Sequence, residues 1–472
     1  MPSPTSQPAD DRPPGAPLPP DPAYLSALQA QVDAAARAAA PLGSTAAGAP
    51  EELVRAVVEA VEALGPRLVA LSHDLAEHPE TAFEEHRSAG VLADLAGEHG
   101  LEVERGAHGL PTALRADVRG GPGTGDDDAG QPVVAVMSEY DALPGIGHGC
   151  GHNVIAAAGL GAALGLAALG DRLPGGVRWL GTPAEEGGAG KETMARHGAL
   201  DGVDAAVMVH PFGYDVADHL FLGRRQLRAT FAGLTAHASA QPFMGRNALD
   251  AVALTYQAVG LHRQQMPPSD RLHCVVTEGG DRPNVIPGRA QMLFYLRSER
   301  PETLRVLSER LDAMCRGAAL MTGCGVDLTW DESPATLPVR ANGPLAGRWG
   351  ARMAERGRPV LPSGVVPALL AASTDFGNVS YRVPSLHPMI AVSDPGTSLH
   401  TRDFADAAAG PAGDRAVVDG AVGLALVLLD HLCDTDLSAA VRADFEAAGG
   451  AVDVPAYFEA SAQDVPAAGS AA

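Results

Sequence analysis

Aromatic residues and positive charge are both scarce in this chain of 472 residues. Phe, Trp and Tyr make up only 4% of it, so a core must be built mainly from Ala, Val and Leu, within the 46% of residues that are apolar. Lys and Arg number 34 against 57 Asp and Glu, which gives a formal net charge of -23. This balance argues against binding nucleic acid or an anionic membrane by bulk electrostatic attraction.

Cysteine and long apolar runs are also scarce. The five cysteines are irregularly spaced, which argues against a disulfide framework and favours a reducing compartment. The first 22 residues are rich in proline and lack both a basic start and an apolar segment, so they do not resemble a secretory signal. The most apolar stretch, residues 154–170, is rich in Ala and Gly, and we expect a buried helix there instead of a membrane span. These features predict a cytoplasmic protein.

Composition and periodicity divide the chain into segments. Residues 1–50 are expected to be disordered or loosely helical, and residues 447–472 to be a flexible tail, because both are rich in Ala and Pro. Residues 51–223 and 336–446 are predicted to form one α/β domain, into which a second domain over residues 224–335 is inserted. The length of the chain fits this division, at about 150 residues per domain.

Three short apolar runs predict buried strands of a mostly parallel sheet with helices on both faces. They are VVAVM (133–137), VRWLG (177–181) and AAVMV (205–209), and helical patterns lie among them. Ligands bind beyond the carboxyl ends of the strands in open α/β sheets. The polar residues that follow the three runs are therefore expected to meet at one rim, and they include Glu139, Asp141, Glu185, Glu186 and His210.

The pattern changes in the inserted segment. Apolar alternation and helical spacing over residues 224–330 predict the order strand, helix, strand, strand, helix, strand. That order is typical of a ferredoxin-like unit of two layers.

The stretch HGCGHN, residues 148–153, carries a thiol and imidazoles on nearly bare backbone. Cys150 and His152 are ligand types for zinc and similar metals, and the glycine between them lets the backbone bend toward one ion. A glycine turn with chance polar residues, or a structural zinc clip, would show the same pattern. No second C-x-x-C knuckle is present, which argues against a zinc finger. A helix that begins near Asn153 is expected to favour the thiolate form of Cys150.

The adjacent carboxylates of GTPAEEGG suggest a division of labour. One can bind a metal ion while the other accepts a proton from a metal-bound water. A solvated loop is the common alternative, and isolated histidines such as His210 and His400 are more often structural than ligating. The chain lacks G-x-S-x-G, a complete P-loop and G-x-G-x-x-G, which argues against a serine nucleophile elbow and against nucleotide sites.

Eight motifs occur in the order typical of one family: HPETAFEEHRSA, SEYDALPGIGHGCGHN, GTPAEEGG, MVHP, GLTAHASA, RPNVIPGR, STDFGNVS and SLHTRDF. With them the chain resembles the co-catalytic metallo-amidohydrolases of peptidase clan MH, over about residues 70–435. It is most similar to the aminobenzoyl-glutamate, hippurate and auxin-conjugate hydrolase subgroup, nearest the dipeptidase-like branch. The resemblance implies a zinc-exopeptidase-like α/β domain with an inserted ferredoxin-like lid, and homodimerisation through that lid.

The resemblance also implies two divalent metal ions per chain. Thiolate and imidazole ligands favour Zn²⁺, with Mn²⁺ or Co²⁺ as alternatives. The implied ligands are Cys150, His152, Glu186, His210 and His400, and Cys150 is expected to bridge both ions.

Further roles follow from the same resemblance. Glu185 is the implied general base, and Asp141, with Glu139, is expected to support the metal ligands from behind. His237 is expected to reach the active site of the partner subunit and to stabilise the oxyanion there. The residues expected from it to line the substrate pocket are Asn284 and Asp375. Apart from the resemblance, Arg297 and Arg282 are candidates to bind a carboxylate of the substrate, and a solvated surface position is the common alternative for such arginines.

The chain departs from the subgroup at two positions, Gly149, where Ala is frequent, and Asn153, where the hippurate and auxin branch has Asp. The second departure weakens any transfer of that branch's substrate preference. The implied function is hydrolysis of an amide bond in a small molecule, an N-acyl amino acid or dipeptide-like compound of the aminobenzoyl-glutamate or β-alanyl-dipeptide kind. Two alternatives stay open: a non-catalytic metal-binding homologue with a binding or regulatory role, and a deacetylase or ureido-amidohydrolase of the same fold.

Overall fold

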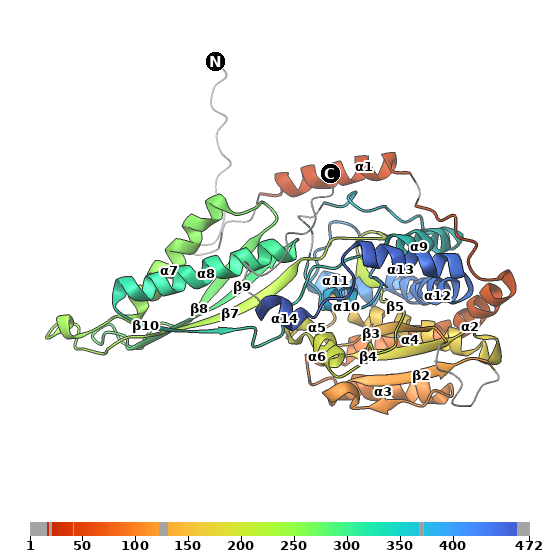
Figure 1. Cartoon of the computed structure of the whole chain (residues 1–472), viewed down its shortest axis with the longest axis horizontal. Helices are drawn as coiled ribbons and strands as arrows, with labels where there is room; N and C mark the ends of the chain where they lie inside the picture. Colours follow the sequence, from red (N-terminus) through yellow and green to blue (C-terminus); the bar gives the residue numbers. More distant parts are fainter. Residues whose placement is uncertain are drawn as a thin grey trace, which may run out of the picture.

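The computed structural model describes residues 17, 21–40, 42–121, 131–367, 370 and 372–459. Figure 1 shows a broad layered part and a long arm in which two helices lie over extended strands. The predictions made for most of residues 1–20, for 122–130 and for 460–472 lie outside the described residues.

The layered part is built on a sheet whose strand order, within the described residues, is β1-β2-β4-β3-β5-β11. These strands are β1 (Glu104–Arg105), β2 (Leu114–Arg119), β3 (Val133–Glu139), β4 (Gly176–Thr182), β5 (Ala205–Val207) and β11 (Ser385–Leu386). β3 lies parallel to β4 and β5, and β5 lies parallel to β11, whereas β2 is antiparallel to both of its neighbours. Every residue of β3 and β4 is buried, which explains why their sequences are almost continuously apolar. The predicted mostly parallel sheet is confirmed.

Helices cover both faces of this sheet. Val134 and Val136 of β3 point into the core beneath one helical layer, and Ala135 and Met137 point into the core on the opposite face. The first layer contains α2 (Glu51–Glu77), α3 (His86–Glu98), α4 (His152–Ala167) and α12 (Pro411–Cys433), and the opposite face is covered by α6 (Gly190–Arg196) and α10 (Phe376–Ser380). Around the first layer lie α9 (Gly343–Glu355), α11 (Arg402–Ala408) and α13 (Thr435–Ala447).

Helix α4 is the predicted buried helix, and glycines set how closely it packs. A Cβ at Gly159 would lie 2.4 Å from the backbone oxygen of Met137, so only glycine permits this approach of α4 to β3. A Cβ at Gly165 would lie 2.3 Å from a methyl group of Val61 on α2. α4 is thereby held against the carboxyl-terminal half of β3, with its first residue, His152, near the end of that strand.

Helix α12 has the length and composition of a membrane-spanning helix. In the structure, 78% of its apolar window is buried, because it packs against α4 and α2 in the centre of the domain.

The arm in Figure 1 is the inserted domain, and its elements follow the predicted order. They are β7 (Gly223–Ala232), α7 (Ala248–His262), β8 (Arg271–Glu278), β9 (Arg289–Ser298), α8 (Pro301–Thr322) and β10 (Gly325–Trp330). The strands form an antiparallel sheet in the order β10-β7-β9-β8. Leu227, Phe231 and Phe294 face α7 and α8 in the core, so Arg224 and Arg297, at the other phase of the strands, belong to the opposite face of the sheet.

The N-terminal extension contains a helix, α1 (Ala23–Ala38), and a segment that docks on the main domain. Leu28 and Val32 of α1 are buried. The Ala49 N–H donates to Asp430 of α12 at 2.7 Å, and the same carboxylate accepts hydrogen bonds from Arg348 and Arg352 of α9.

The C-terminal segment departs from the expected flexible tail. Residues Val454–Glu459 form α14, in which Val454 is buried and the ring of Phe458 lies 4.7 Å from the guanidinium of Arg225 on β7. The Ala-rich composition of this segment concealed an aromatic contact that joins residues 454–459 to the inserted domain.

The remaining elements are short. They are β6 (His210–Phe212), β12 (Met389–Ala391), α5 (Glu185–Gly188) and the 3-10 turns Ala107–Gly109, Gly170–Arg172, Pro242–Met244 and Arg263–Gln265. β6 and β12 form a separate parallel pair.

Candidate metal centre

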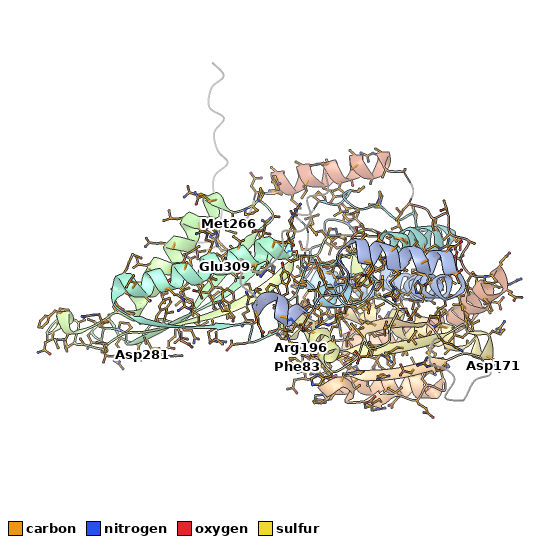
Figure 2. All side chains as sticks on the ribbon, viewed as in Figure 1. Phe83, Asp171, Arg196, Met266, Asp281 and Glu309 are labelled. Atoms are coloured by element: carbon orange, nitrogen blue, oxygen red, sulfur yellow. The ribbon has the colours of Figure 1, made fainter. Side chains whose placement is uncertain are left out.

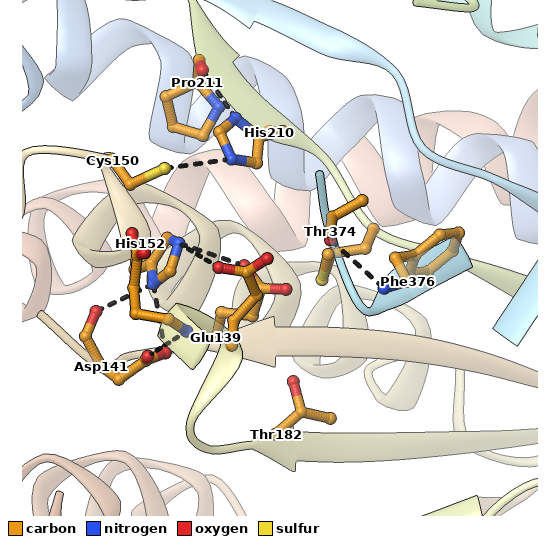
Figure 3. Close-up of polar contacts among 12 residues, drawn as sticks. Glu139, Asp141, Cys150, His152, Thr182, His210, Pro211, Thr374 and Phe376 are labelled. Atoms are coloured by element: carbon orange, nitrogen blue, oxygen red, sulfur yellow. Dashed lines mark hydrogen bonds and ion pairs between the residues drawn. The ribbon is translucent and has the colours of Figure 1, made fainter. Parts of the chain in front are cut away.

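The carboxyl ends of the central strands deliver the predicted polar residues to one rim. β3 and β4 run in register until Glu139 lies opposite Thr182, so the segments that follow both strands leave the sheet at the same edge. α4 begins there with His152, α5 carries Glu185 and Glu186, and β6 begins with His210. Figure 3 shows Glu139, Asp141, Cys150, His152 and His210 facing one another at this edge.

The donor atoms at this rim form groups of the size that a metal ion requires. Cys150, His152 and His210 make one group and Cys150, Glu186 and His400 another, and within each the donor atoms all lie within 4.8 Å of one another. Cys150 belongs to both groups, as a bridging ligand must. A third group joins His152 to Glu185 and Glu186.

Buried polar atoms that make no hydrogen bond support the same interpretation. Nε2 of His152, Oε1 of Glu186 and Oε2 of Glu139 are buried and have no hydrogen-bond partner among the described residues; their nearest charged contacts, His152 Nε2 to Glu139 Oε2 and Glu186 Oε1 to His400 Nε2, are each 3.4 Å. Buried polar atoms are rarely left unsatisfied, so these three indicate a group that is bound when the protein acts. Nitrogen, sulfur and carboxylate oxygen together suit zinc and related divalent ions. The residues present therefore fit two divalent metal ions.

Asp141 links two of the candidate ligands. Its Oδ1 lies 3.2 Å from Nδ1 of His152, which also lies 2.8 Å from the backbone oxygen of Asp141. Its Oδ2 accepts a hydrogen bond from the backbone N–H of Glu186 at 2.8 Å. One carboxylate thus orients the His152 ring, leaving Nε2 for a metal, and fixes the backbone of Glu186.

Unusual backbone conformations shape the loops that carry the ligands. Gly147 and Gly151 have φ of +86° and +80°, which glycine adopts freely, so the predicted bending around Cys150 is present. His400 has φ of +61°, which is costly for a residue with a side chain. The N–H of His400 donates to the backbone oxygen of Gly149 at 2.8 Å, which ties the His400 loop to the turn that carries Cys150.

The expected thiolate of Cys150 is not favoured by the protein alone. Burial raises the pKa of this thiol well above its ordinary value, and the charge of Glu186 raises it further. These effects outweigh the start of α4. A bound divalent ion would reverse the balance, because a coordinating thiol loses its proton to the metal.

Glu185 has the properties expected of a proton acceptor next to such ions. Burial raises the pKa of its carboxyl well above the ordinary value, and the neighbouring charges of Glu186 and Glu139 act in the same direction. Its Oε2 lies 3.9 Å from Nε2 of His152, so it stands beside the candidate ligands.

Lys191 was not predicted as a site residue, yet it lies behind this centre. Its ammonium group donates to Asp375 at 2.7 Å and also to Glu139, and its backbone N–H donates to Asp375 at 2.9 Å. Both oxygens of Asp375 are therefore engaged by Lys191, and Asp375 also lines the pocket that opens on the candidate ligands, where it was expected. One feature of the sequence could have drawn attention to this residue, because Lys191 is the single lysine of the chain.

A pocket of about 170 Å³ opens on the candidate ligands. Pockets that enclose drug-sized molecules are usually larger than about 300 Å³, so this one suits a small substrate. Its lining includes Cys150, Glu185, Glu186, His210, His400, Phe221, Thr336, Ser373, Thr374, Asp375, Arg224 and Arg297. Arg297 was a predicted site residue, whereas Arg224 was not. A larger groove of about 710 Å³ lies between α7 and α8 and contains none of the candidate ligands.

The structure does not bring His237 and Asn284 to this pocket. His237 is exposed on the inserted domain, where its Nδ1 accepts a hydrogen bond from the N–H of Ala240 at 3.2 Å. The backbone oxygen of Asn284 accepts a hydrogen bond from the N–H of Ala238. Figure 2 shows the neighbouring Asp281 on the inserted domain, well away from the layered part. Arg282 lines cavities of that region and not the pocket.

Comparisons with known proteins agree with this geometry. A sequence model of Peptidase family M20/M25/M40 matches residues 135–417. An Xaa-Arg dipeptidase of Mus musculus is 35% identical over 416 residues, which span 86% of this chain and 94% of the relative. One of the two p-aminobenzoyl-glutamate hydrolase subunits of Escherichia coli is 30% identical over 425 residues, or 74% of this chain and 86% of the relative. A dinuclear metal-binding M20 peptidase of Bacillus subtilis shares the fold with a TM-score of 0.57 at 22% identity, over 78% of this chain and 99% of that one.

Proposed function

The chain belongs to peptidase family M20/M25/M40 and is a hydrolase of amide bonds, and from this premise we propose that it cleaves small N-acyl amino acids or dipeptide-like amides at a centre of two divalent ions. The observation that carries the proposal is the position of Cys150 in both ligand groups, with Glu185 beside them. Cys150, His152 and His210 would hold one ion, and Cys150, Glu186 and His400 the other. Zn²⁺ suits these donors best, and Mn²⁺ or Co²⁺ could replace it.

When bound, the two ions polarise the substrate carbonyl and make a water molecule more acidic. Glu185 is then placed to take a proton from the attacking water, because its carboxyl lies at the pocket wall beside the ligands. The raised pKa of Glu185 suits the reverse transfer as well, in which it donates that proton to the leaving amine. Arg297 lines the same pocket and is the candidate partner for a carboxylate of the substrate.

We propose that His237 of a second copy of the chain stabilises the oxyanion formed in this pocket, because this chain's own His237 lies away from the pocket. β8 is an edge strand of the inserted sheet, and Val275 and Val276 on it are 58% and 47% exposed. Tyr256 on α7 is 56% exposed. An apolar, unpaired edge of this kind is a ready surface for strand addition. We assign it to a homodimer that brings His237 and Asn284 to the partner's pocket.

The compartment proposed for this reaction is the cytoplasm. All five cysteines are free, as a reducing compartment would keep them.

Substitution of Glu185 tests the proposal. Glu185→Gln keeps the shape of the side chain but cannot accept a proton, so bound metal should stay at the wild-type level while turnover falls about 10²–10⁴-fold. The substrates are aminobenzoyl-glutamate, β-alanyl dipeptides, N-acetyl amino acids and an N-carbamoyl amino acid, each with Zn²⁺, Mn²⁺ or Co²⁺ added. If the wild type turned over the N-carbamoyl amino acid, which contains a ureido group, and none of the other substrates, the ureido-amidohydrolase alternative would be favoured. Metal binding without turnover of any compound would favour the non-catalytic homologue.

The dimer has its own test. Val275→Lys places a charge on the edge of β8 and should produce monomers in light scattering together with loss of turnover. Mixing inactive His237→Ala with inactive Glu185→Gln should restore part of the activity, because a mixed dimer contains one pocket with both residues intact. No recovery on mixing would place His237 outside the partner's site.

A further inference from the structure

Two arginines face each other across neighbouring strands at the pocket. Arg224 of β7 and Arg297 of β9 are paired in the sheet register, and both side chains line the pocket that opens on the candidate metal ligands. Arg224 is buried, with 8% of its surface exposed. Burial lowers the pKa of Arg297 and the charge of Arg224 lowers it further, while the more weakly acting charges of Glu185 and Glu186 raise it.

The other arginines of β7 show what Arg224 lacks. Arg225 pairs with Asp331 at 2.6 Å, and Arg228 pairs with Glu332 at 2.6 Å. The guanidinium of Arg224 contacts the hydroxyl of Ser333, at 3.3 Å, and the ring of Tyr295, at 5.2 Å from its centroid. Within the part of the chain that the structure describes, neither Arg224 nor Arg297 has a carboxylate at ion-pair distance.

Arg224 is buried and Arg297 is half-buried, and two guanidinium groups so placed, with no carboxylate at ion-pair distance, are stabilised when an anion joins them. The Tyr295 ring lies 5.2 Å from the guanidinium carbon of Arg224, and one long hydrogen bond to Ser333, at 3.3 Å, is the hydrogen bond that its side chain makes among the described residues, so N–H groups remain for an acceptor. Arg297 is a sufficient partner for one carboxylate, since a guanidinium binds a carboxylate through two parallel hydrogen bonds. Arg224 then supplies a second site for an anion in the same pocket.

We propose that Arg224 determines specificity by binding a second carboxylate of the substrate, so that the enzyme prefers amides whose leaving amino acid has an acidic side chain. This inference rests on the proposed amide hydrolysis, and it names the class of leaving residue. The α-carboxylate lies on Arg297 and the side-chain carboxylate on Arg224. A basic side chain on the leaving residue would be repelled by the positive charge of Arg224. The inference therefore disfavours arginine as the leaving residue, although the murine relative is named an Xaa-Arg dipeptidase.

The experiment compares four aminobenzoyl amides that differ only in the leaving residue: glutamate, glutamine, leucine and arginine. For the wild type, kcat/KM should be at least about tenfold higher for glutamate than for glutamine, and lowest for arginine. Arg224→Gln should lower kcat/KM for the glutamate amide about 10–100-fold, the usual effect of losing a hydrogen bond to a charged group, while the glutamine amide changes less than about threefold. Arg224→Glu should raise the ratio of arginine to glutamate turnover.

Arg228→Gln is the matched control. It removes an arginine from the same face of the same strand, but Arg228 is paired with Glu332 and does not line the pocket, so the ratio between the four amides should stay at the wild-type value. Bound metal is measured in every variant, because Arg224 contacts none of the candidate ligands and its loss should leave metal content unchanged.

A binding measurement separates this inference from the proposed function. Glutarate carries two carboxylates and no amide, so its calorimetric affinity reports on the arginine pair even if no amide is cleaved. Glutarate should bind the metal-loaded wild type at least about tenfold more tightly than Arg224→Gln. Equal affinity in the two proteins, or a wild-type preference for the arginine amide, would overturn the inference. If Arg224→Gln bound glutarate more weakly than the wild type but the wild type cleaved none of the amides, the proposed function alone would be overturned.

Discussion

Asp141 lies behind His152 and orients it: its Oδ1 is 3.2 Å from Nδ1 of the ring, and Nε2 is left without a hydrogen-bond partner among the described residues. The other oxygen of Asp141 holds the backbone N–H of Glu186. Asp141→Asn should therefore weaken binding of both ions about 10–100-fold, the usual cost of losing such a support. Competition with a chelating dye measures this directly. Wild-type affinity in Asp141→Asn would mean that packing alone holds His152 in place.

Substitution of Cys150 and substitution of His400 should differ in the number of metal ions that the protein loses. Cys150 belongs to both ligand groups, so Cys150→Ser should reduce bound metal from about two ions per chain toward none, and activity should fall with it. His400 belongs to one of the two groups, and His400→Ala should leave about one ion bound. Elemental analysis of protein purified without chelator gives both numbers. Equal losses in the two variants would argue against a bridging cysteine.

How far the sequence predicted this site depends on how local each signal is. Glu139, Glu185 and His210 follow buried apolar strands, and the rule that parallel strands present their carboxyl ends at one edge was enough to bring them together. His400 has no such strand before it, and only the motif SLHTRDF pointed to it. The fold was predictable for the same reason, since β3, β4 and the inserted domain carry their periodicity in the sequence.

Pairings between distant segments left no comparable signal. Lys191 and Asp375 are 184 residues apart, and their ion pair depends on how α6 and the loop before α10 pack on one sheet. Arg224 and Arg297 meet only because β7 and β9 are paired in one register. Strand pairing places such residues, and no local pattern in either strand specifies its partner. The anchor at Phe458 was missed because two adjacent rings, Tyr457 and Phe458, hardly alter the composition of an Ala-rich segment.

The close approach of α4 to β3 can be tested at a single glycine. Gly159→Ala would place a methyl group 2.4 Å from the backbone oxygen of Met137, so the helix must move, and the free energy of unfolding should fall by about 1–3 kcal/mol. Gly97→Ala is the control, because that position on α3 has nothing within 4 Å of a new Cβ and should gain about 0.5–1 kcal/mol from the better helix former. Urea unfolding of the metal-free proteins gives both values. Similar stabilities in the two variants would show that α4 can shift without cost.

His219 should make the stability of the metal-free protein depend on pH. Burial lowers the pKa of His219 to about 4, from an ordinary value of 6.5. Between these values the unfolded chain binds a proton that the folded chain does not, so stability is highest above pH 6.5 and falls as the pH is lowered toward 4. The contribution of this one group is about 3 kcal/mol. His219→Phe keeps an aromatic ring against Phe212 and Phe221 and should flatten this part of the profile, as measured by urea unfolding at intervals of pH. An unchanged slope would assign the dependence to other buried groups.

Lys191 joins three segments of the site, and its charge should be required there. Its ammonium group is buried between Glu139 and Asp375, so Lys191→Met leaves two carboxylates without a counter-charge and should cost about 3–5 kcal/mol of stability. Lys191→Arg keeps the charge but places a larger, planar group in a space shaped for an ammonium, and it should recover only part of this loss. The double variant Lys191→Met with Asp375→Asn removes one of the stranded charges and should be more stable than Lys191→Met alone. Unfolding curves of the three variants test whether the charge of Lys191 is required. If Lys191 only filled space, Lys191→Met would be about as stable as the wild type, and adding Asp375→Asn would not increase its stability.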